Sequence, residues 1–239
     1  MAVKLFVLGL PGSGKSSVAR YISMRAGDKR WSTTHIGDYA ILYKMFQEDA
    51  KEQFKPACHG GFDVLDLNVI DTALKTLEQE VNRYFSCAKS DEIILIEFAR
   101  NDYQKAFQQF SPEFLQNAYF LYLDVEIGTC KQRICDRVAN QTYDDDHYVS
   151  EYIFEAYYHR DDGQCLSHIL ERDYKIDQQR VRIIDNNCSL EAASKKINSF
   201  IDPIIDSELA PINTSDTPAN SSSGEPTTDD AVDTIPMPY

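Results

Sequence analysis

Short runs of apolar residues alternate along the chain with longer segments in which apolar residues recur at helical spacing. The runs are rich in β-branched and aromatic residues, so they predict strands. These strands are expected at Val3–Leu8, Trp31–Ile36, Glu92–Phe98, Ala118–Val125 and Val181–Ile184. The first, third and fourth runs are nearly continuous in apolar residues, which is typical of parallel strands covered by helices on both faces.

The segments between the strands have an apolar stripe at a period of about 3.6 residues, which predicts helices. They are expected at Ser16–Arg25, Tyr39–Phe54, Val69–Phe85, Cys130–Ala139, Val149–Tyr158, Gln164–Arg172 and Leu190–Phe200. Regular alternation of strand and helix implies an α/β fold with a parallel sheet and right-handed crossovers.

Two intervals between the expected strands are longer than a simple crossover needs. Residues 39–91 contain two of the expected helices, joined by a Pro- and Gly-containing connection at Pro56–Gly61. Residues 140–160 follow the helix after the fourth strand. Long insertions at the carboxyl edge of a parallel sheet usually form a substrate site or a lid. We therefore expect residues 39–91 to bind a substrate and residues 140–160 to act as a lid.

The sequence directly after the first strand has the spacing of a phosphate-binding loop, Gly-x-x-x-x-Gly-Lys-Ser. Its glycines allow close approach of the backbone, and its N–H groups converge on an anion at a helix N-terminus. Lys15 then reaches the terminal phosphates of a nucleotide, and the Ser16 hydroxyl can ligate Mg²⁺. The alternative is an ordinary Gly-rich turn. The expected nucleotide-binding residues are Gly9, Pro11, Gly12, Ser13, Gly14, Lys15, Ser16 and Ser17.

A second set of candidates follows the third expected strand. Glu97 closes the apolar run Ile93–Ile96, and Arg100 comes three positions later. A carboxylate at the tip of a buried strand can hold Mg²⁺ through water or accept a proton, although it can also simply meet solvent. The arginine fork suits a phosphate or carboxylate on a substrate.

Asp38 ends the second expected strand and opens a helix. An Asp in this place is commonly a helix N-cap. It can also orient or deprotonate the hydroxyl of an acceptor, and the two roles are compatible.

Arg133 and Arg137 lie four residues apart on an expected helix, so both side chains are on one face. They can form a solvated basic face, or they can stabilise the charge of a phosphate in transfer. The net charge of −14 favours the second role, because such a chain must concentrate its cations where polyphosphate binds.

The same acidic balance argues against nucleic-acid or membrane-surface binding, since both require a basic face. From Asp206 to Tyr239 there is no Lys or Arg, and Pro, Ser, Thr and Asn dominate. Such a segment buries too little apolar surface to offset its ordering entropy, so residues 206–239 are expected to form a disordered tail after a domain at 1–205.

The six cysteines are scattered without a Cys-x-x-Cys pair, which predicts reduced thiols. No apolar stretch approaches the roughly 20 residues needed to span a bilayer, and no secretory leader is recognisable. These features predict a cytoplasmic protein.

In this combination of motifs the chain resembles the P-loop nucleoside and nucleotide kinase-like group, the adenylate-kinase-like folds in particular. The resemblance implies a five-stranded parallel sheet with helices on both faces, a helical acceptor-binding insert and a short lid. It also implies ATP and Mg²⁺ as cofactors, with Lys15, Arg133 and Arg137 on the transferred phosphate. Ser16 would then ligate the metal, and Arg100 would contact the acceptor.

The acceptor is left open by departures from that pattern. Glu97-Phe98-Ala99-Arg100 stands where adenylate kinases have Asp-Gly-Phe-Pro-Arg, and the expected lid has no arginine between Asn140 and Ser150. We expect a nucleoside or nucleoside monophosphate as the small-molecule acceptor. The alternatives are a metabolite hydroxyl, as in gluconate-kinase-like or zeta-toxin-like enzymes, or a nucleotide-dependent switch without catalysis. A monomer or a homodimer is expected.

Overall fold

The computed structural model divides the chain into two units, Met1–Leu209 and Ala210–Tyr239. All residues that the structure describes belong to the first unit. They are residues 2–57, 61–140, 148–158, 161–187 and 189–209.

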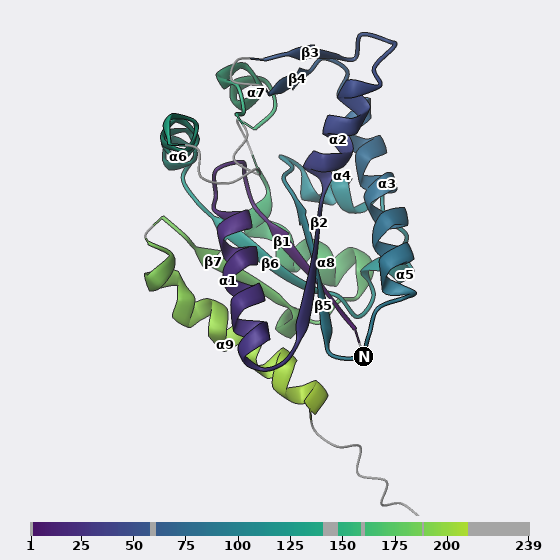
Figure 1. Cartoon of the computed structure of the whole chain (residues 1–239), viewed down its shortest axis with the longest axis vertical. Coiled ribbons are helices and arrows are strands. Elements are labelled where there is room, and N and C mark those ends of the chain that lie inside the picture. The colour runs from purple at the N-terminus through teal and green to yellow at the C-terminus, as the bar shows by residue number, and fades with distance from the viewer. Residues whose placement is uncertain (1, 58–60, 141–147, 159–160, 188, 210–239) are drawn as a thin grey trace, which may run out of the picture. The chain divides into compact units, whose positions relative to one another are not determined.

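A five-stranded parallel sheet forms the centre of this unit, in the order β2-β5-β1-β6-β7 (Figure 1). The strands are β1 Val3–Leu8, β2 Ser32–Gly37, β5 Glu92–Phe98, β6 Tyr119–Asp124 and β7 Val181–Asp185. Each lies within one residue of its expected bounds. The long apolar runs became the central strands because parallel strands in the middle of a sheet are covered on both faces. The α/β fold with a five-stranded parallel sheet is thus confirmed.

The longer helices of this unit also follow the expected order. They are α1 Lys15–Asp28, α2 Asp38–Gln47, α3 Asn68–Phe85, α6 Ile127–Ala139, α7 Glu151–Ala156, α8 Leu166–Tyr174 and α9 Leu190–Leu209. Two short helices were not expected, α4 Tyr103–Phe107 and α5 Pro112–Leu115. Both begin at a side-chain cap, since Asp102 accepts from the N–H of Lys105 and Ser111 from that of Phe114. Capping residues of this kind can be recognised in a sequence. Helices this short have no periodic apolar stripe, however, and so they were not predicted.

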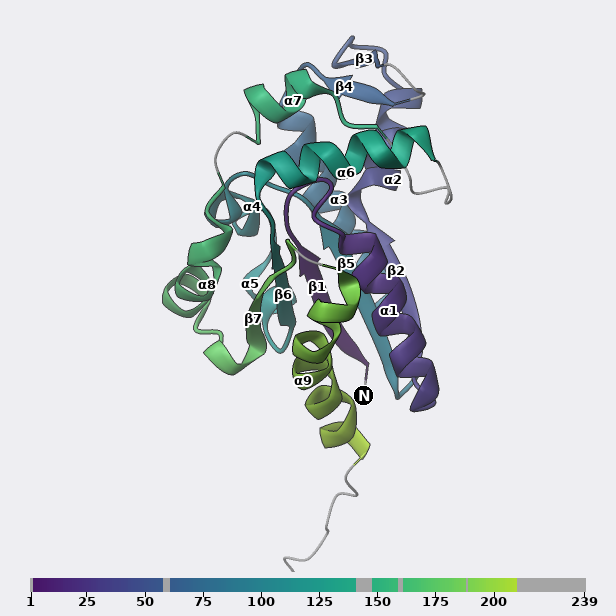
Figure 2. The same ribbon diagram turned by 90° about the vertical axis from the view of Figure 1, so that its left-hand side faces the viewer.

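The two faces of the sheet have separate cores. On one face, α1 and α9 cover a cluster that includes Leu5, Val7 and Leu95 (Figure 2). On the other face, α3, α4, α5 and α8 cover Phe6 and Phe98. Phe6 stacks on Phe120 with ring centroids 4.8 Å apart, and its ring also meets four other phenylalanines edge-on. This aromatic cluster fixes the three central strands against the helices of that face.

The insert between β2 and β5 differs from the expectation. The sequence predicted a helix over Tyr39–Phe54, but α2 ends at Gln47, and the chain then forms an antiparallel hairpin. Its strands are β3 Phe54–Pro56 and β4 Phe62–Val64. Asp49 ends the helical course, because its carboxylate accepts from the N–H groups of Lys51 and Phe54.

The apolar side of the hairpin packs against the two helices of the insert, α2 and α3. Phe54 and Val64 pack with Val69 and Ile70 of α3, and Phe62 is stacked on Phe46 of α2 with ring centroids 5.3 Å apart. The apolar residues of the expected helix Tyr39–Phe54 are thus divided between α2 and the first strand of the hairpin. The insert is therefore a mixed structure and not a purely helical one.

The C-terminal helix extends past the expected domain boundary at residue 205. Ile204 and Ile205 of α9 are buried against α1, and Lys29 Nζ lies 2.8 Å from Asp206 Oδ1. The compact unit accordingly ends at Leu209. Among the described residues, no helix combines the length and apolar character required to cross a membrane.

We expect Phe6→Ala to lower the free energy of unfolding by about 3–5 kcal/mol, because it removes a fully buried ring from the centre of the aromatic cluster. Urea denaturation followed by circular dichroism measures this change. Tyr84→Ala is the control, since Tyr84 is half exposed on α3 and its removal should cost less than about 1 kcal/mol. Equal losses in both variants would contradict the assignment of Phe6 to the core.

Candidate active site

The loop between β1 and α1 requires glycine at the two positions that the motif reserves for it, Gly9 and Gly14, and also at Gly12. Gly9, Gly12 and Gly14 have φ angles of 139°, 80° and 95°, which disfavour residues with a side chain. A Cβ on Gly12 would also collide with the backbone carbonyl of Cys130 in α6. The loop therefore closes tightly under α6, with its N–H groups at the N-terminal end of α1.

Two side chains that were not among the expected site residues hold this loop in place. Tyr103 of α4 is fully buried, and its hydroxyl accepts from the N–H of Gly9 at 2.9 Å. Asn186, directly after β7, donates through Nδ2 to the carbonyl of Ser13 at 2.8 Å. Both residues come from elements far along the chain, so the loop is fixed by tertiary contacts as well as by its own glycines.

Lys15 lies inside the loop. Its ammonium donates to the carbonyl of Leu10 at 3.1 Å, and its Nζ is 3.9 Å from Oε1 of Glu97. Burial lowers the pKa of Lys15, Glu97 and Asp38 oppose that shift, and the charge of Arg137 adds to it. The ammonium is thus a desolvated cation at the place where the loop receives phosphate.

Glu97 joins the loop to the neighbouring strands. Ser16 Oγ donates to its Oε1 at 3.2 Å, and His35 Nε2 of β2 lies 2.9 Å from its Oε2. Burial opposes ionisation, but the hydrogen bond from His35 and the charge of Lys15 outweigh it and hold the pKa of Glu97 below its usual value. The carboxylate is therefore charged at neutral pH.

The Ser16 hydroxyl and the Glu97 carboxylate fit Mg²⁺ by chemistry, because this ion prefers oxygen ligands and keeps several waters. Within the described residues no group of three or more His, Cys, Asp or Glu side chains could hold a metal alone. A metal in this place would therefore be bound partly by these side chains and partly by the phosphates of a nucleotide. His35 was not foreseen here, since it lies diagonally across the β2–β5 register from Glu97.

Asp38 and Arg100 form a buried ion pair at the edge of the sheet. Arg100 Nη1 is 2.5 Å from Asp38 Oδ2, and the guanidinium also donates to the carbonyls of Ala99 and Ile70 at 2.6 and 2.9 Å. Burial raises the pKa of Asp38, and the arginine charge opposes this shift. With the guanidinium so close, we take the carboxylate to be ionised at neutral pH.

The N-cap role considered for Asp38 is not what the structure has. Gly37 occupies the cap position of α2, where no side-chain hydrogen bond is made, and Asp38 is the first residue of the helix. Its carboxylate faces Arg100. The helix dipole still favours a negative charge in this first turn.

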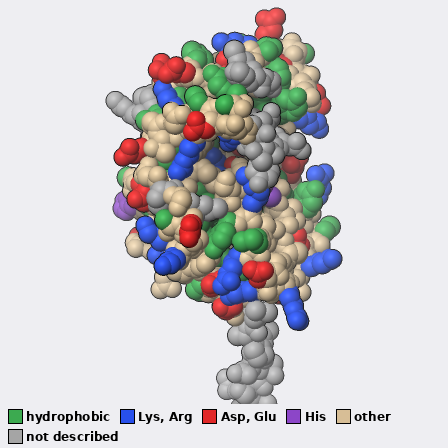
Figure 3. Space-filling model, turned by 60° about the vertical axis from the view of Figure 1, so that its left-hand side comes forward, with side chains coloured by type: hydrophobic (Ala, Val, Ile, Leu, Met, Phe, Trp, Pro, Cys, Tyr) green, Lys and Arg blue, Asp and Glu red, His purple; other side chains and the backbone are tan. Residues whose placement is uncertain are grey.

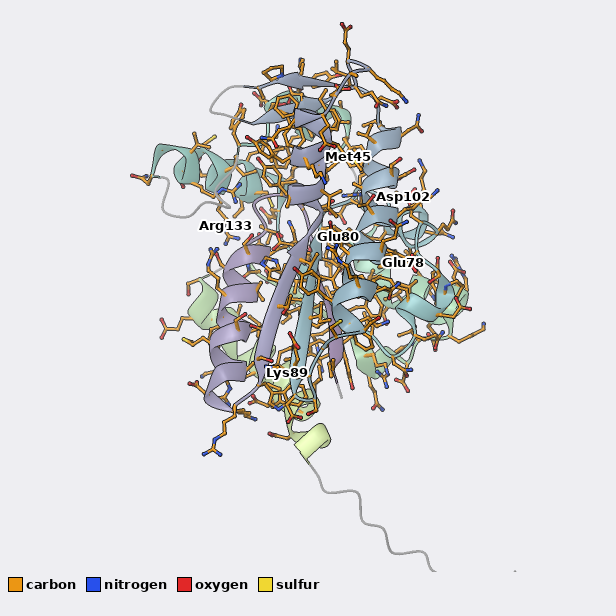
Figure 4. The ribbon with its side chains drawn as sticks, turned by 45° about the vertical axis from the view of Figure 1, so that its right-hand side comes forward. Met45, Glu78, Glu80, Lys89, Asp102 and Arg133 are labelled. Carbon is orange, nitrogen blue, oxygen red and sulfur yellow. The ribbon has the colours of Figure 1, made fainter. Side chains whose placement is uncertain are left out.

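The side chains of Arg133 and Arg137 lie in different surroundings, although the two residues are four positions apart on α6. Arg133 Nη2 donates to the carbonyl of Asn186 at 2.9 Å, and Asn186 is the residue whose side chain anchors Ser13. In Figure 4, Arg133 points from α6 toward the loop end of α1. Arg137 instead lines the cavity described next.

One cavity extends from the loop to the insert, and its lining includes Lys15, Ser16, Asp38, Glu97, Arg100 and Arg137. The structure thus brings together the expected site residues from the loop, β5, α2 and α6. Figure 3 shows this side of the molecule hollowed, with basic side chains in and around the hollow.

The far side of the cavity is closed by the insert and by the segment at 148–158. Ser150 Oγ donates to Asp63 of β4 at 2.5 Å, and the Tyr158 hydroxyl donates to the carbonyl of Ala99 at 3.3 Å. Residues 141–147 and 159–160 of the expected lid lie outside the described residues.

A scan against models of protein families gives no match, and a search of curated proteins gives none. Among solved structures, the chain is similar to Kti12 of Chaetomium thermophilum in complex with ADP-AlF3. The identity is 15% and the TM-score 0.54, over 85% of this chain and 97% of that one. It is also similar to an unliganded sugar kinase from Janibacter sp. HTCC2649, with 15% identity and a TM-score of 0.51 over 86% and 98% of the two chains.

The loop, the parallel sheet order and these likenesses define a P-loop NTPase fold. Within that class, the chain has the nucleotide-kinase-like form, which confirms the resemblance found in the sequence. At such low identity the likeness concerns the fold, so activity has to be argued from the site.

We expect His35→Ala to weaken the Mg²⁺-dependent part of nucleotide affinity by about 10-fold, because Glu97 loses the donor that orients its carboxylate. Calorimetric titration with a non-hydrolysable ATP analogue, in Mg²⁺ and in EDTA, measures this part. His35→Gln, which keeps a donor, should restore some of it.

Thr34→Ala is the matched control for His35→Ala. Thr34 directly precedes His35 in β2, and its hydroxyl donates to another acid of β5, Glu92, at 2.7 Å. Its replacement should leave the Mg²⁺ dependence unchanged. An equal loss in the control, or none in His35→Ala, would show that His35 does not orient Glu97.

Proposed function

We propose that the protein is an ATP- and Mg²⁺-dependent phosphotransferase that moves the γ-phosphate to a small-molecule acceptor. The observation that carries this proposal is the continuous cavity from the phosphate-binding loop to Asp38 and the insert. A protein that only binds nucleotide needs the loop. It has no need for a cavity that continues past the loop to the buried carboxylate of Asp38 and the insert.

In this function the loop N–H groups and Lys15 bind the β- and γ-phosphates. Mg²⁺ held by Ser16 and, through water, by Glu97 would neutralise charge on these phosphates. Arg137, which lines the cavity, stabilises the phosphoryl group during transfer, and Arg133 supports the loop through Asn186.

With an alcohol as acceptor, Asp38 accepts a hydrogen bond from the acceptor hydroxyl in this proposal. The hydroxyl oxygen forms the new bond to the γ-phosphorus as the bond to the ADP oxygen breaks. The hydroxyl proton passes to the Asp38 carboxylate and then to solvent. With an alcohol as acceptor, the products are ADP and a phosphate monoester. With a nucleoside monophosphate, the attacking oxygen belongs to its phosphate, no hydroxyl proton is transferred, and the products are ADP and a nucleoside diphosphate.

For the acceptor we propose a nucleoside or a nucleoside monophosphate, supported by the aromatic side chains of the insert that line the cavity. A metabolite hydroxyl remains the second candidate, because an Asp after the second strand suits activation of any alcohol.

We expect Lys15→Ala to reduce acceptor-dependent ADP release by about 100-fold or more, because one preorganised donor to the transferred phosphate is lost. A coupled assay of ADP across nucleosides, monophosphates and sugar acids measures it. Lys44→Ala is the control, since Lys44 is exposed on α2 and lies outside the cavity. Nucleotide binding without Lys15-dependent transfer to any acceptor would favour a switch over an enzyme.

Asp38→Asn should lower kcat by about 100-fold or more, because the acceptor hydroxyl loses its proton acceptor. The affinity for ATP should stay within about 2-fold, since the loop is unchanged. Steady-state kinetics and calorimetry separate the two effects, and circular dichroism checks that the variant is folded. A large loss of ATP affinity with an unchanged kcat would place Asp38 in nucleotide binding instead.

A further inference from the structure

The end of the cavity that lies away from the loop has a different lining. Its side chains are aromatic and aliphatic, and they include Tyr39, Phe62, Ile70, Ile153, Tyr157 and Tyr158. They come from the insert and from the segment at 148–158. Figures 1 and 2 both show β3, β4 and α7 together beyond the carboxyl ends of the strands.

The aromatic rings in this lining are ordered by their neighbours. Tyr39 and Phe62 stack nearly parallel, with centroids 5.6 Å apart and an interplanar angle of 17°. Tyr157 and Tyr158 meet edge to face at 4.8 Å. Rings held in this way offer flat, apolar surface to a planar ligand at little entropic cost.

The cations of the described lining already have roles at the loop or partners of their own. Lys15 and Arg20 belong to α1, which begins at the loop. The charge of Arg137 acts on Lys15 and also on Tyr39, and the proposed function assigns Arg137 to the transferred phosphate. Arg100, which is 2% exposed, is already bound to Asp38 and to two backbone carbonyls. Its charge is therefore compensated before any acceptor enters.

An anionic group at the insert end would be buried beside the Asp38 carboxylate, with Arg100 engaged by that same carboxylate. Burying a charge without a partner is strongly unfavourable. A sugar acid or polyol would in addition have no planar ring to stack on the aromatic side chains.

We propose that the acceptor is an uncharged alcohol that carries a planar ring system. The hydroxyl lies at Asp38, and the planar group lies among Tyr39, Phe62, Tyr157 and Tyr158. This inference rests on the proposed function and narrows it: a nucleoside satisfies these requirements, and its 5′-monophosphate does not.

Matched pairs of probes test this inference on the full-length protein with Mg²⁺ and a non-hydrolysable ATP analogue. Adenosine is compared with AMP, and uridine with UMP, together with gluconate and 2-phenylethanol. Saturation-transfer NMR and calorimetry report binding without turnover. The expected result is a Kd at least 10-fold lower for the nucleoside of a pair, with saturation transferred to its base protons.

Tighter binding of a monophosphate or of gluconate would overturn the inference. So would the absence of binding by both nucleosides and by 2-phenylethanol. The proposed function fails on a separate measurement, namely if Lys15→Ala leaves ADP release unchanged with every acceptor. Transfer to AMP or gluconate alone would keep the proposed function and reject the narrower acceptor class.

Two variants of one ring test the stacking itself. Phe62→Ala should raise the Kd of the preferred uncharged probe at least 10-fold. Phe62→Leu, which keeps apolar bulk but no ring, should raise it by an intermediate factor. Both should bind the ATP analogue as the unchanged protein does, which shows that the loop is intact. Tyr84→Ala is the aromatic control outside the cavity, and an equal effect there would contradict the assignment.

Discussion

The buried ion pair between Asp38 and Arg100 is the contact on which the arrangement of the site depends. Arg100 follows β5, Asp38 begins α2, and the same guanidinium binds the carbonyl of Ile70 in α3. One side chain thus joins the sheet edge to both helices of the insert. Because removing one partner of a buried pair costs about 3–5 kcal/mol, this contact resists local opening of the cavity. The same pair engages the guanidinium of Arg100, which an anionic acceptor would otherwise need as its partner.

The site is one cavity with two differently lined ends, and the ion pair lies where these ends meet. On one side, Lys15 and Glu97 lie next to glycine-rich backbone, which provides fixed dipoles for polyphosphate. On the other side, aromatic rings of the insert and of the 148–158 segment form an apolar lining. Phosphoryl transfer needs such a boundary, because the reacting hydroxyl must reach the γ-phosphate while water is kept out.

The phosphate-binding loop depends on distant residues more than its motif suggests. The hydroxyl of Tyr103 binds the N–H of Gly9, Asn186 binds the carbonyl of Ser13, and Arg133 binds the carbonyl of Asn186. These contacts link α4, the end of β7 and α6 to one turn of backbone. A preorganised loop binds phosphate without first losing conformational entropy, so the distant residues contribute to function by holding it.

The sequence by itself determined the sheet and the phosphate-binding loop, because apolar runs and Gly-Lys-Ser spacing are local patterns with local causes. It also placed Asp38, Glu97 and Arg100 at strand ends, which parallel topology brings to one edge. Only the tertiary structure decided their partners. The hairpin after Asp49 is held by packing on α2 and α3. The His35–Glu97 contact and the ion pair of Arg100 with Asp38 join residues that are distant in sequence, and the first of these lies diagonally across a strand register. Such pairings follow from packing in three dimensions, which a one-dimensional pattern does not encode.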